Sequence, residues 1–521
     1  MSDVRGVPGG LPGTPPGENG GPGEYGGTGS PAMRGGIPAG RSPGAAPPPR
    51  GRHASSQETV ERALAAARPG GDCVVIADET STANLRWAGN TLTTNGVAVS
   101  RSLTVIAIDR RSGGAAGVGV VSRSGVRPDQ VEDVVREAEK AAAEASPAED
   151  AMDLVSGDGG VRSESPDWSS APVATDFGVF RTFAGQLGET LRAADGAGRK
   201  LYGFAEHGVT STFLGTSAGL RLRHDQPAGR LELNAKSADL ARSAWAGAAT
   251  RDFTDVDVAA LDAGLAERLS WQERRIALPA GRYETLLPPT AVADLMIGLY
   301  WSAGARDAGE GRTVFSKPGG GTRIGERLAG LPVDLFSDPA YPGLECAPFV
   351  IAHASGRDSS VFDNGLPVGR ASWISGGVLS ALYSSRYSAA VTGLPVTPPA
   401  DNLIMSPGPA GSSASLESMI ASTKRGLLLT SLWYIREVDP QTLLLTGLTR
   451  DGVYLVEDGE VVGAVNNFRF NETPVGMLSR LAEAGGCEPT LPREWGDYFS
   501  RTAMPPLRVA AFNMSSVSQA S

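Results

Sequence analysis

Three observations in the sequence predict an α+β fold with two domains. The chain has 521 residues, which is long enough for two or three domains of ordinary size. Segments with helical and with strand-like patterns occur together in both halves of the chain. A helical segment at about residues 257–271 separates the two halves, and we find no internal repeat.

Residues 1–54 differ in composition from the rest of the chain. About half of the first 50 residues are Gly or Pro, and large apolar side chains are almost absent. Such a segment cannot bury enough apolar surface to offset the entropy lost on ordering. We therefore expect a disordered tail, with an arm that docks on a partner as the alternative.

The N-terminal domain is predicted to cover residues 55–250 and to begin with a helix. Ser55 and Glu58 form an S-x-x-E capping box ahead of apolar side chains on one helical face, and Pro69 ends that helix. A second long helix is expected to start at Pro128, in a segment rich in strong helix formers. Three strands are predicted between these helices: Cys73–Asp78, Leu103–Asp109 and Gly117–Ser122.

A third helix is expected from Phe177 to about Ala194. Six residues are predicted to form its buried face: Phe177, Phe180, Phe183, Ala184, Leu187 and Leu191. The segments KLYGFAEH, VTSTFLGT, GLRLRHD and RLELNAK follow. Their alternation of apolar and polar residues, with short turns between them, predicts an antiparallel meander.

Residues 251–275 contain the predicted linking helix, and residues 276–521 are expected to form a strand-rich C-terminal domain. A helix from Thr290 to about Ala305 lies near the start of this domain. Short strands and Gly/Pro turns dominate the remainder.

Charge and cysteine content exclude several classes of protein. The net charge of −10 is unfavourable for binding nucleic acid or an anionic membrane. Cys73, Cys346 and Cys487 lie far apart, which argues against a disulfide scaffold. The N-terminus lacks the apolar region of a signal peptide, and no apolar run reaches the ~20 residues that a membrane helix needs, so we expect neither export nor a membrane span. We therefore expect a cytoplasmic protein.

One motif resembles a site for a nucleophile. Gly215–Gly219 reads G-T-S-A-G, formally G-x-S-x-G, but the following residues alternate like a strand, whereas a nucleophile elbow needs a helix there. We interpret the motif as a hairpin turn. His224 could approach Ser217 across this hairpin, but no acid that could orient the histidine is apparent.

The sequence offers no convincing metal or phosphate site either. The histidines are His53, His207, His224 and His353, and no two of them have the spacing that places both rings on one helical face. Cys346 and His353 are interpreted as a buried thiol and a hydrogen-bonded surface histidine. The Gly-rich stretch at residues 318–326 lacks the G-K-[ST] ending of a phosphate loop, so we expect a flexible surface loop. We assign no catalytic, cofactor-binding or metal-binding residue to this chain.

Several segments of the second half together resemble the TldD/TldE (PmbA) metallopeptidase family, and more closely its TldE/PmbA branch. They include RTVFSKPGGGTRIGERLAG, VFDNGLPVGRASWISGGVLSALYSSRYSAAVTG, NLIMSPG and ASLESMIASTKRGLLLTSLWY. VYLVEDGEVVGAVNNFRF and PPLRVAAFNMSSVSQA continue the resemblance, which covers residues 55–521.

The resemblance implies a subunit of a heterodimeric zinc metallopeptidase that encloses a chamber for peptides. In that family the TldD subunit carries a helix with H-E-x-x-x-H, whose histidines bind zinc and whose glutamate acts as general base. The corresponding segment here is residues 291–313. Near the expected position stand Leu299, Tyr300, Trp301, Ser302, Ala303 and Gly304.

None of these side chains is expected to hold Zn²⁺, and no carboxylate takes the place of the base. Where family members often show D-[DS]-E-G, this chain has Asp363-Asn364-Gly365. The resemblance therefore implies a non-catalytic partner that completes the chamber, while a TldD-like subunit supplies the zinc. Phe468, Arg469 and Phe470 are candidates for lining an interface or cavity, with ordinary strand packing as the alternative.

Three hypotheses remain for the function. The first is this non-catalytic subunit of a peptide-degrading or peptide-processing complex. The second is a peptide-binding or scaffolding protein without a protease partner. The third is a hydrolase that uses Ser217 or another site of its own.

Overall fold

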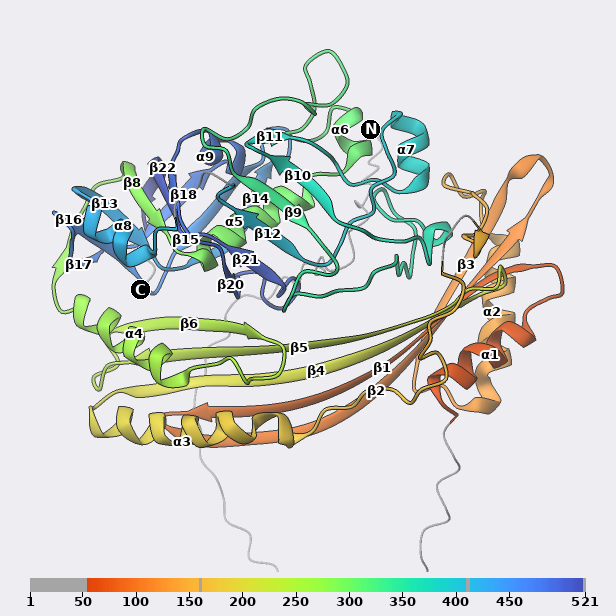
Figure 1. The fold of residues 1–521 in the computed structure, drawn as a ribbon, viewed down its shortest axis with the longest axis horizontal. Coiled ribbons are helices and arrows are strands. Elements are labelled where there is room, and N and C mark those ends of the chain that lie inside the picture. The colour runs from red at the N-terminus through yellow and green to blue at the C-terminus, as the bar shows by residue number, and fades with distance from the viewer. Residues whose placement is uncertain (1–53, 159–161, 409–412, 519–521) are drawn as a thin grey trace, which may run out of the picture.

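The computed structural model describes residues 54–158, 162–408 and 413–518 (Figure 1). The expected Gly/Pro-rich tail, apart from its last residue, lies outside these residues, and so does His53. The described chain mixes helices and strands in two parts, which confirms the predicted α+β class.

A six-stranded antiparallel sheet forms the N-terminal part, and its long strands curve beneath the C-terminal part (Figure 1). In spatial order its strands are β3 (Ala116–Ser124), β2 (Thr91–Arg110), β1 (Asp72–Ala88), β4 (Lys200–Thr216), β5 (Arg221–Lys236) and β6 (Ser243–Thr250).

Helices cover one face of this sheet. They are α1 (Ser56–Ala66), α2 (Val131–Glu144), α3 (Arg181–Gly196) and α4 (Val258–Trp271), with 3-10 turns η1 (Ser112–Gly114), η2 (Pro128–Gln130) and η4 (Phe177–Phe180). Because side chains alternate along a strand, Val75 and Trp87 of β1 pack under these helices. Val74 and Ile76 point to the opposite face, where they meet Phe362 of the C-terminal part.

The predicted N-terminal elements are confirmed in type, and several of their lengths are wrong. The Ser55 capping box is present, with the Ser55 hydroxyl accepting from the Glu58 N–H. The four segments of the predicted meander are only two strands, β4 and β5, each continuous through the expected turn. Pro227 is tolerated inside β5 because the pairing with β6 begins only at Gly229, so no neighbour there needs the missing N–H.

The predicted buried face of the third helix needs a correction. Phe180, Phe183, Leu187 and Leu191 are buried as expected. Phe177 and Ala184, in contrast, are exposed. Phe177 lies in η4, whose tighter turn shifts it away from the face that α3 buries.

The C-terminal part contains two further sheets. The smaller one orders its strands as β11 (Val378–Leu379), β10 (Ala371–Ser375), β9 (Asp334–Ser337), β12 (Leu403–Ser406), β21 (Thr502–Met504) and β20 (Glu488–Thr490). The larger one contains β14 (Leu432–Asp439), β15 (Leu444–Thr449), β18 (Phe468–Glu472), β22 (Leu507–Val517), β8 (Gly281–Leu287), β13 (Arg425–Leu429), β16 (Val453–Glu457), β17 (Glu460–Val465) and β7 (Arg275–Ile276), with β19 (Leu481–Ala484) paired to β22.

The main core of the molecule lies between these two sheets and surrounds α5 (Pro289–Trp301). The remaining helical segments are α6 (Ala305–Gly309), η5 (Val361–Asp363), α7 (Arg386–Thr392), α8 (Leu416–Ser422) and α9 (Pro474–Ser479). The described part of the chain has no helix long and apolar enough to span a membrane.

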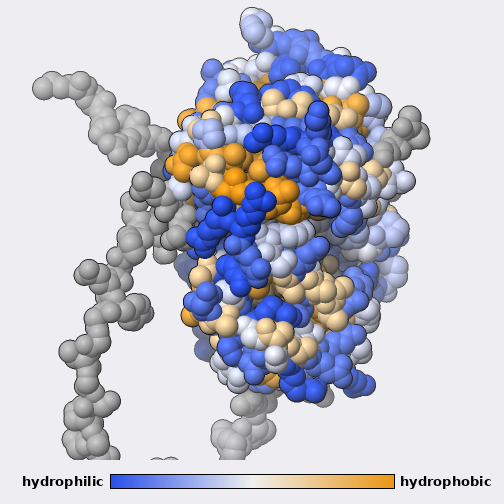
Figure 2. Space-filling model, turned by 90° about the vertical axis from the view of Figure 1, so that its left-hand side faces the viewer, coloured by the Kyte–Doolittle hydropathy of each residue, from blue (hydrophilic) through white to orange (hydrophobic). Residues whose placement is uncertain are grey.

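The two parts meet through α4 and the strands above it. Trp271 at the end of α4 packs edge-on against Tyr454 of β16, with ring centroids 5.0 Å apart. Next to this contact, the Ser243 hydroxyl of β6 donates to Asp451 at 2.6 Å. Figure 2 shows this end of the molecule, where apolar side chains gather in the upper half and hydrophilic ones surround them.

Close contact between α2 and β3 depends on glycine. A Cβ atom at Gly119 would lie 2.1 Å from the Ala138 carbonyl oxygen of α2. We predict that Gly119→Ala lowers the free energy of unfolding by about 1–3 kcal/mol, because α2 must move off the sheet. Chemical denaturation measures this change.

Gly188→Ala is the matched control. Gly188 lies in α3 with no atom within 4 Å of an added Cβ, so the substitution should stabilise by up to about 1 kcal/mol. Equal stability of Gly119→Ala and the unsubstituted protein would contradict the tight α2–β3 contact.

Candidate functional site

The segment that corresponds to the expected metal-binding helix folds as two helices, where the sequence predicted one. α5 ends at Trp301, and α6 begins at Ala305. The chain between them is fixed by close packing, since a Cβ at Gly304 would lie 2.4 Å from a carboxylate oxygen of Asp358. The predicted helix to about Ala305 is therefore too long.

α5 is buried along most of its length, and only Thr290, Gly298 and Trp301 are partly exposed. Its residues from Leu295 to Ile297 are fully buried, and so is the acidic Asp294. The Asp294 carboxylate accepts hydrogen bonds from the backbone N–H groups of Glu494, at 2.9 Å, and Arg493, at 3.2 Å. Burial raises the pKa of Asp294 well above its usual range. This carboxylate therefore anchors the 493–495 loop on the helix.

An aromatic cluster occupies the C-terminal turn of α5. The Tyr300 ring packs against Trp373, Tyr383 and Phe499, with centroid distances of 5.4 to 5.9 Å. Its hydroxyl donates to the Ala400 carbonyl at 2.9 Å and accepts from the Ala400 N–H at 3.0 Å. Burial raises the pKa of Tyr300 far above its usual value, so the hydroxyl stays protonated.

These residues do not fit the zinc ion that the sequence resemblance implies for the TldD subunit. Zinc sites in proteins use thiolate, imidazole and carboxylate donors. The positions at residues 299–304 supply instead apolar side chains, one hydroxyl at Ser302 and the fully bonded hydroxyl of Tyr300. Within the described ranges, no group of three or more His, Cys, Asp or Glu side chains could hold a metal ion.

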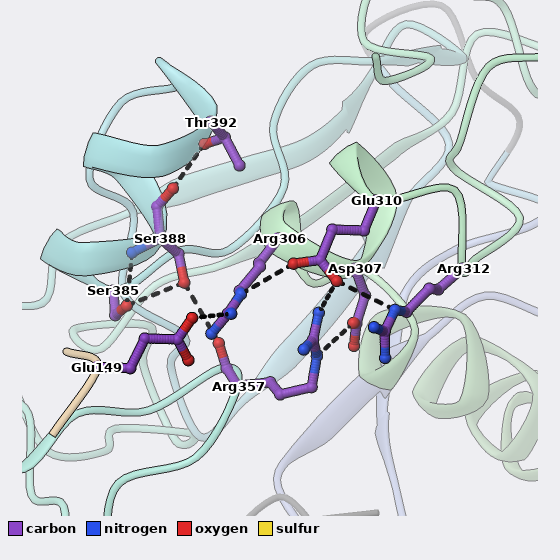
Figure 3. Close-up of polar contacts among 9 residues, drawn as sticks. All are labelled: Glu149, Arg306, Asp307, Glu310, Arg312, Arg357, Ser385, Ser388 and Thr392. Carbon is purple, nitrogen blue, oxygen red and sulfur yellow. Dashed lines mark hydrogen bonds and ion pairs between the residues drawn. The ribbon is translucent and has the colours of Figure 1, made fainter. Parts of the chain in front are cut away.

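Beyond α5, the side chains of α6 enter an ion-pair network (Figure 3). Arg306 donates to Glu149 at 2.5 Å and to Glu310 at 3.1 Å. Arg357 donates to Asp307 at 2.5 Å and also to Glu310. Because Glu149 comes from the N-terminal part, the network joins the two parts of the chain.

Further contacts extend the network to α7 and to the end of α6. Arg312 lies 3.0 Å from Glu310, and the Ser388 hydroxyl donates to the Arg357 carbonyl at 3.2 Å. The hydrogen bond from Arg306 lowers the pKa of Glu149. Burial alone would raise the pKa of Glu310, but hydrogen bonds from Arg357 and Arg306 lower it. These carboxylates stay ionised and serve as structural partners for the arginines.

Asp358 is the unusual member of this region. It is largely buried beside Gly304 and has no hydrogen bond within the described residues. Burial, together with the neighbouring charge of Asp307, raises its pKa to about 6, while Arg357 and Arg306 oppose the shift. Asp358 can therefore exchange a proton near neutral pH, but no nucleophilic side chain bonds to it.

The structure does not bring Ser217 and His224 together. GTSAG forms the turn between β4 and β5, as predicted, and the Ser217 hydroxyl accepts from the Cys73 N–H at 2.9 Å. The register of the two strands pairs His224 with Thr212, and the His224 ring bonds to Gln226. Burial lowers the pKa of His224.

The remaining histidine and thiol predictions agree with the structure. Cys346 is buried, which raises the pKa of its thiol to about 11. His353 is exposed and lies 3.3 Å from the Thr104 hydroxyl. His207 is buried, with one ring nitrogen 2.7 Å from the Thr175 hydroxyl and the other 2.8 Å from the Arg251 carbonyl.

Most of the other residues to which the sequence drew attention have structural roles. Asp363 is buried and accepts from the Arg386 side chain at 2.6 Å, and this ion pair fixes the start of α7. Phe468 and Phe470 are fully buried in the core, which supports the alternative of ordinary strand packing, whereas Arg469 between them is exposed. All four glycines at residues 318–326 are exposed and have positive φ: Gly319, Gly320, Gly321 and Gly325.

Sequence reasoning missed Asp294 and Asp358. The pattern around Asp294, PTAVADLMIGLYW, shows one acidic residue within an apolar helix, and this was the available signal for a buried carboxylate. Asp358 had no comparable signal, because residues 353–360 read as a polar loop and its burial comes from residues distant in sequence.

Comparisons with known proteins identify the C-terminal part. Residues 280–516 match the PmbA/TldA metallopeptidase C-terminal domain. Among curated proteins, none matches the chain.

Solved structures with a similar fold cover both parts of the chain. TldE from Thermococcus kodakarensis has a TM-score of 0.68 at 15% identity, covering 87% of this chain and 98% of its own. A protein described as a candidate modulator of a DNA gyrase from Thermotoga maritima has a TM-score of 0.67 at 17% identity, with 88% and 99% covered. A similarly described protein from Bacteroides thetaiotaomicron has a TM-score of 0.66 at 13% identity, with 89% and 98% covered.

The buried position of Asp358 predicts a pH-dependent stability. Its pKa is about 6 in the folded protein against an ordinary 3.8, so ionisation above pH 6 disfavours the folded state. The protonated Asp358 carboxyl contributes its full share to the free energy of unfolding below pH 4, and this contribution is lost as the pH rises through 6. Asp358→Asn should therefore raise the free energy of unfolding by about 2–3 kcal/mol at pH 8, and much less at pH 4, as measured by denaturation at both values.

The exposed Asp153 provides the control, since its carboxylate forms no ion pair in the described structure. Asp153→Asn should change stability little at either pH. A gain from Asp358→Asn that is the same at pH 4 and pH 8 would show that Asp358 does not titrate as its burial requires.

Proposed function

We propose, from the premise that this chain belongs to the TldD/TldE (PmbA) family, that it is the non-catalytic TldE-like subunit of a heterodimeric zinc metallopeptidase. Its partner is a TldD-like subunit with H-E-x-x-x-H, and the complex degrades or processes peptides. The partner supplies the zinc, and this chain forms part of the wall of the substrate chamber.

The burial of α5 is the observation that carries this proposal. A metal-binding helix must present ligands on an open face, together with a position for water or substrate. Here the corresponding helix is enclosed by the core, and Tyr300 at its end is bonded to Ala400. Loss of the ligands with retention of the fold is consistent with a subunit that acts through its shape.

Two pockets in the described structure bear on where a peptide could bind. An open one of about 450 Å³ lies between α3 and the start of α4, where Glu189, Asp255, Asp257 and Asp262 are among its lining residues. A smaller one of about 130 Å³ lies where β5 and β6 meet the C-terminal part, and it accepts at most a side chain or a chain end, since sites for drug-sized ligands occupy about 300–1,000 Å³. In the proposed complex, the partner closes a chamber that this chain encloses only in part.

The alternative of a serine hydrolase has little support. The Ser217 hydroxyl is bonded to the Cys73 backbone, and His224 has another partner. A scaffolding protein without a protease partner has the same fold, so this hypothesis differs from the proposal only in what the chain binds.

A tagged pull-down of this chain from its own host, followed by zinc analysis, tests the proposal. We expect a roughly equimolar partner of the same family that carries H-E-x-x-x-H, with about one zinc per complex. Zinc should stay with the partner when the two chains are separated.

Two other results would contradict the proposal. A lone chain with stoichiometric zinc would mean that this chain has its own metal site. A lone chain without metal would favour the scaffolding protein.

A further inference from the structure

Half of β2 lies at an open edge of the N-terminal sheet. β3 pairs with β2 only at residues 102–110, whereas β1 pairs with β2 along its whole length. Residues 91–101 therefore have a strand neighbour on one side alone within the described chain, and β2 runs along the lower rim of the sheet in Figure 1. Such an edge is a template for another strand.

The direction of the free backbone groups follows from one hydrogen bond. The Gly125 N–H donates to the Arg101 carbonyl at 2.9 Å, so Arg101 directs its carbonyl to the side of β3. In an antiparallel sheet, alternate residues point their N–H and C=O groups to the same side. The backbone N–H and C=O groups of Asn95, Val97 and Val99 therefore point to the open edge.

An exposed apolar strip follows this edge. Val97 and Val99 are 45% and 57% exposed, and their partners in β1 are Ala83 and Ser81. Because Ala83 packs under α3, both valines lie on the helix-covered face of the sheet, at its uncovered margin.

A second segment, which leads into α3, crosses the same face of the sheet. Val173 donates its N–H to the Ser211 hydroxyl of β4, and Thr175 exchanges hydrogen bonds with Ser81 of β1, the cross-strand partner of Val99. The segment therefore runs from β4 across β1 towards β2, and the exposed Phe177 comes next. The strip is thus built from two segments that are distant in sequence. A cluster of this kind on a surface that is otherwise polar marks an interaction site.

The charges favour a protein strand as the occupant. Residues 91–100 carry no charge and no proline, although the chain has a net charge of −10. Arg101, which follows, is paired with Glu79 at 2.6 Å. Another acidic chain can therefore approach this edge without like-charge repulsion, and natural edges normally carry charges or proline to prevent such pairing.

Two other edges of the described sheets lack this combination. β14 ends the largest sheet, but Arg436, Glu437 and Asp439 place charges along it. The β6 edge faces β20 of the C-terminal part and is covered by it.

We propose that the β2 edge at residues 91–101 docks the partner subunit, whose equivalent edge strand adds to it in antiparallel fashion. This inference rests on the proposed function, since the partner is the TldD-like chain and a chain of the same fold presents a corresponding edge. The free N–H and C=O groups of Val97 and Val99 bond to the added strand and so fix its orientation. Phe177 adds apolar contact beside it, and neighbouring surface supplies the rest of the about 800 Å² that a stable interface needs from each side.

Val97→Pro tests the pairing directly. It removes an N–H that points to the open edge and leaves the β1 ladder intact. Val97→Lys/Val99→Lys is the second variant, because charge on an edge blocks strand addition. Val391→Lys/Val438→Lys is the matched control, since these valines are 55% and 58% exposed in the C-terminal part.

Each tagged chain is used to recover the H-E-x-x-x-H subunit from the host, with thermal melting as a check on folding. We expect equal recovery by the unsubstituted chain and the control, and at least a tenfold loss for both edge variants. Hydrogen exchange at Asn95, Val97 and Val99 should slow in the complex.

The other outcomes separate this inference from the proposed function. Full recovery by the edge variants would overturn the docking edge and leave the proposed function standing. Failure of the unsubstituted chain to recover the subunit would overturn both. A homodimer that Val97→Pro converts to a monomer would assign the edge to a second copy and overturn the partner subunit as its occupant.

Discussion

Burial of α5 in the main core is the constraint on which the C-terminal part of this protein depends. The helix lies in the main core between two sheets, and Asp294 on it holds the 493–495 loop through backbone N–H groups. A carboxylate without hydrogen bonds would be very costly in such a place. Asp294 and its loop therefore stabilise each other, and residues 291–297 of the helix are enclosed by the core.

The same constraint explains how this fold is maintained without metal ligands at the end of α5. Packing of α5 maintains the fold whether or not a metal is held there. At the end of the helix, the Tyr300 aromatic cluster fills the space near the expected ligand positions. Beyond it, α6 contributes Arg306 to a network that reaches Glu149 in the N-terminal part, so this region holds the two parts together.

Local signals in the sequence predicted much of the fold. The Ser55 capping box, the helix that follows Pro128 and the GTSAG turn were each specified by a few adjacent residues. The long strands were not predicted at full length, because residues 79–101 are largely polar or exposed. The short apolar alternation at Ala83, Leu85 and Trp87 was the available signal that β1 continues. Pairing with neighbouring strands, a property of distant residues, extends β1 and β2 through this stretch.

The candidate site could be predicted only in part for the same reason. The residue types at positions 299–304 already argued against a zinc ligand set. The burial of α5, the raised pKa of Asp358 and the open β2 edge all arise from contacts between residues far apart in sequence. Phe177 shows the limit of helical periodicity, since a 3-10 turn exposes a residue that an α-helix would have buried.

Peptide hydrolysis by reconstituted components tests the central claim most directly. An unstructured peptide is incubated with this chain alone, with the H-E-x-x-x-H subunit alone, and with an equimolar mixture of both. The account predicts that the mixture cleaves the peptide, that this chain alone does not, and that replacing the glutamate of H-E-x-x-x-H by glutamine abolishes cleavage. Hydrolysis by this chain alone, or by the mixture after that replacement, would contradict the account.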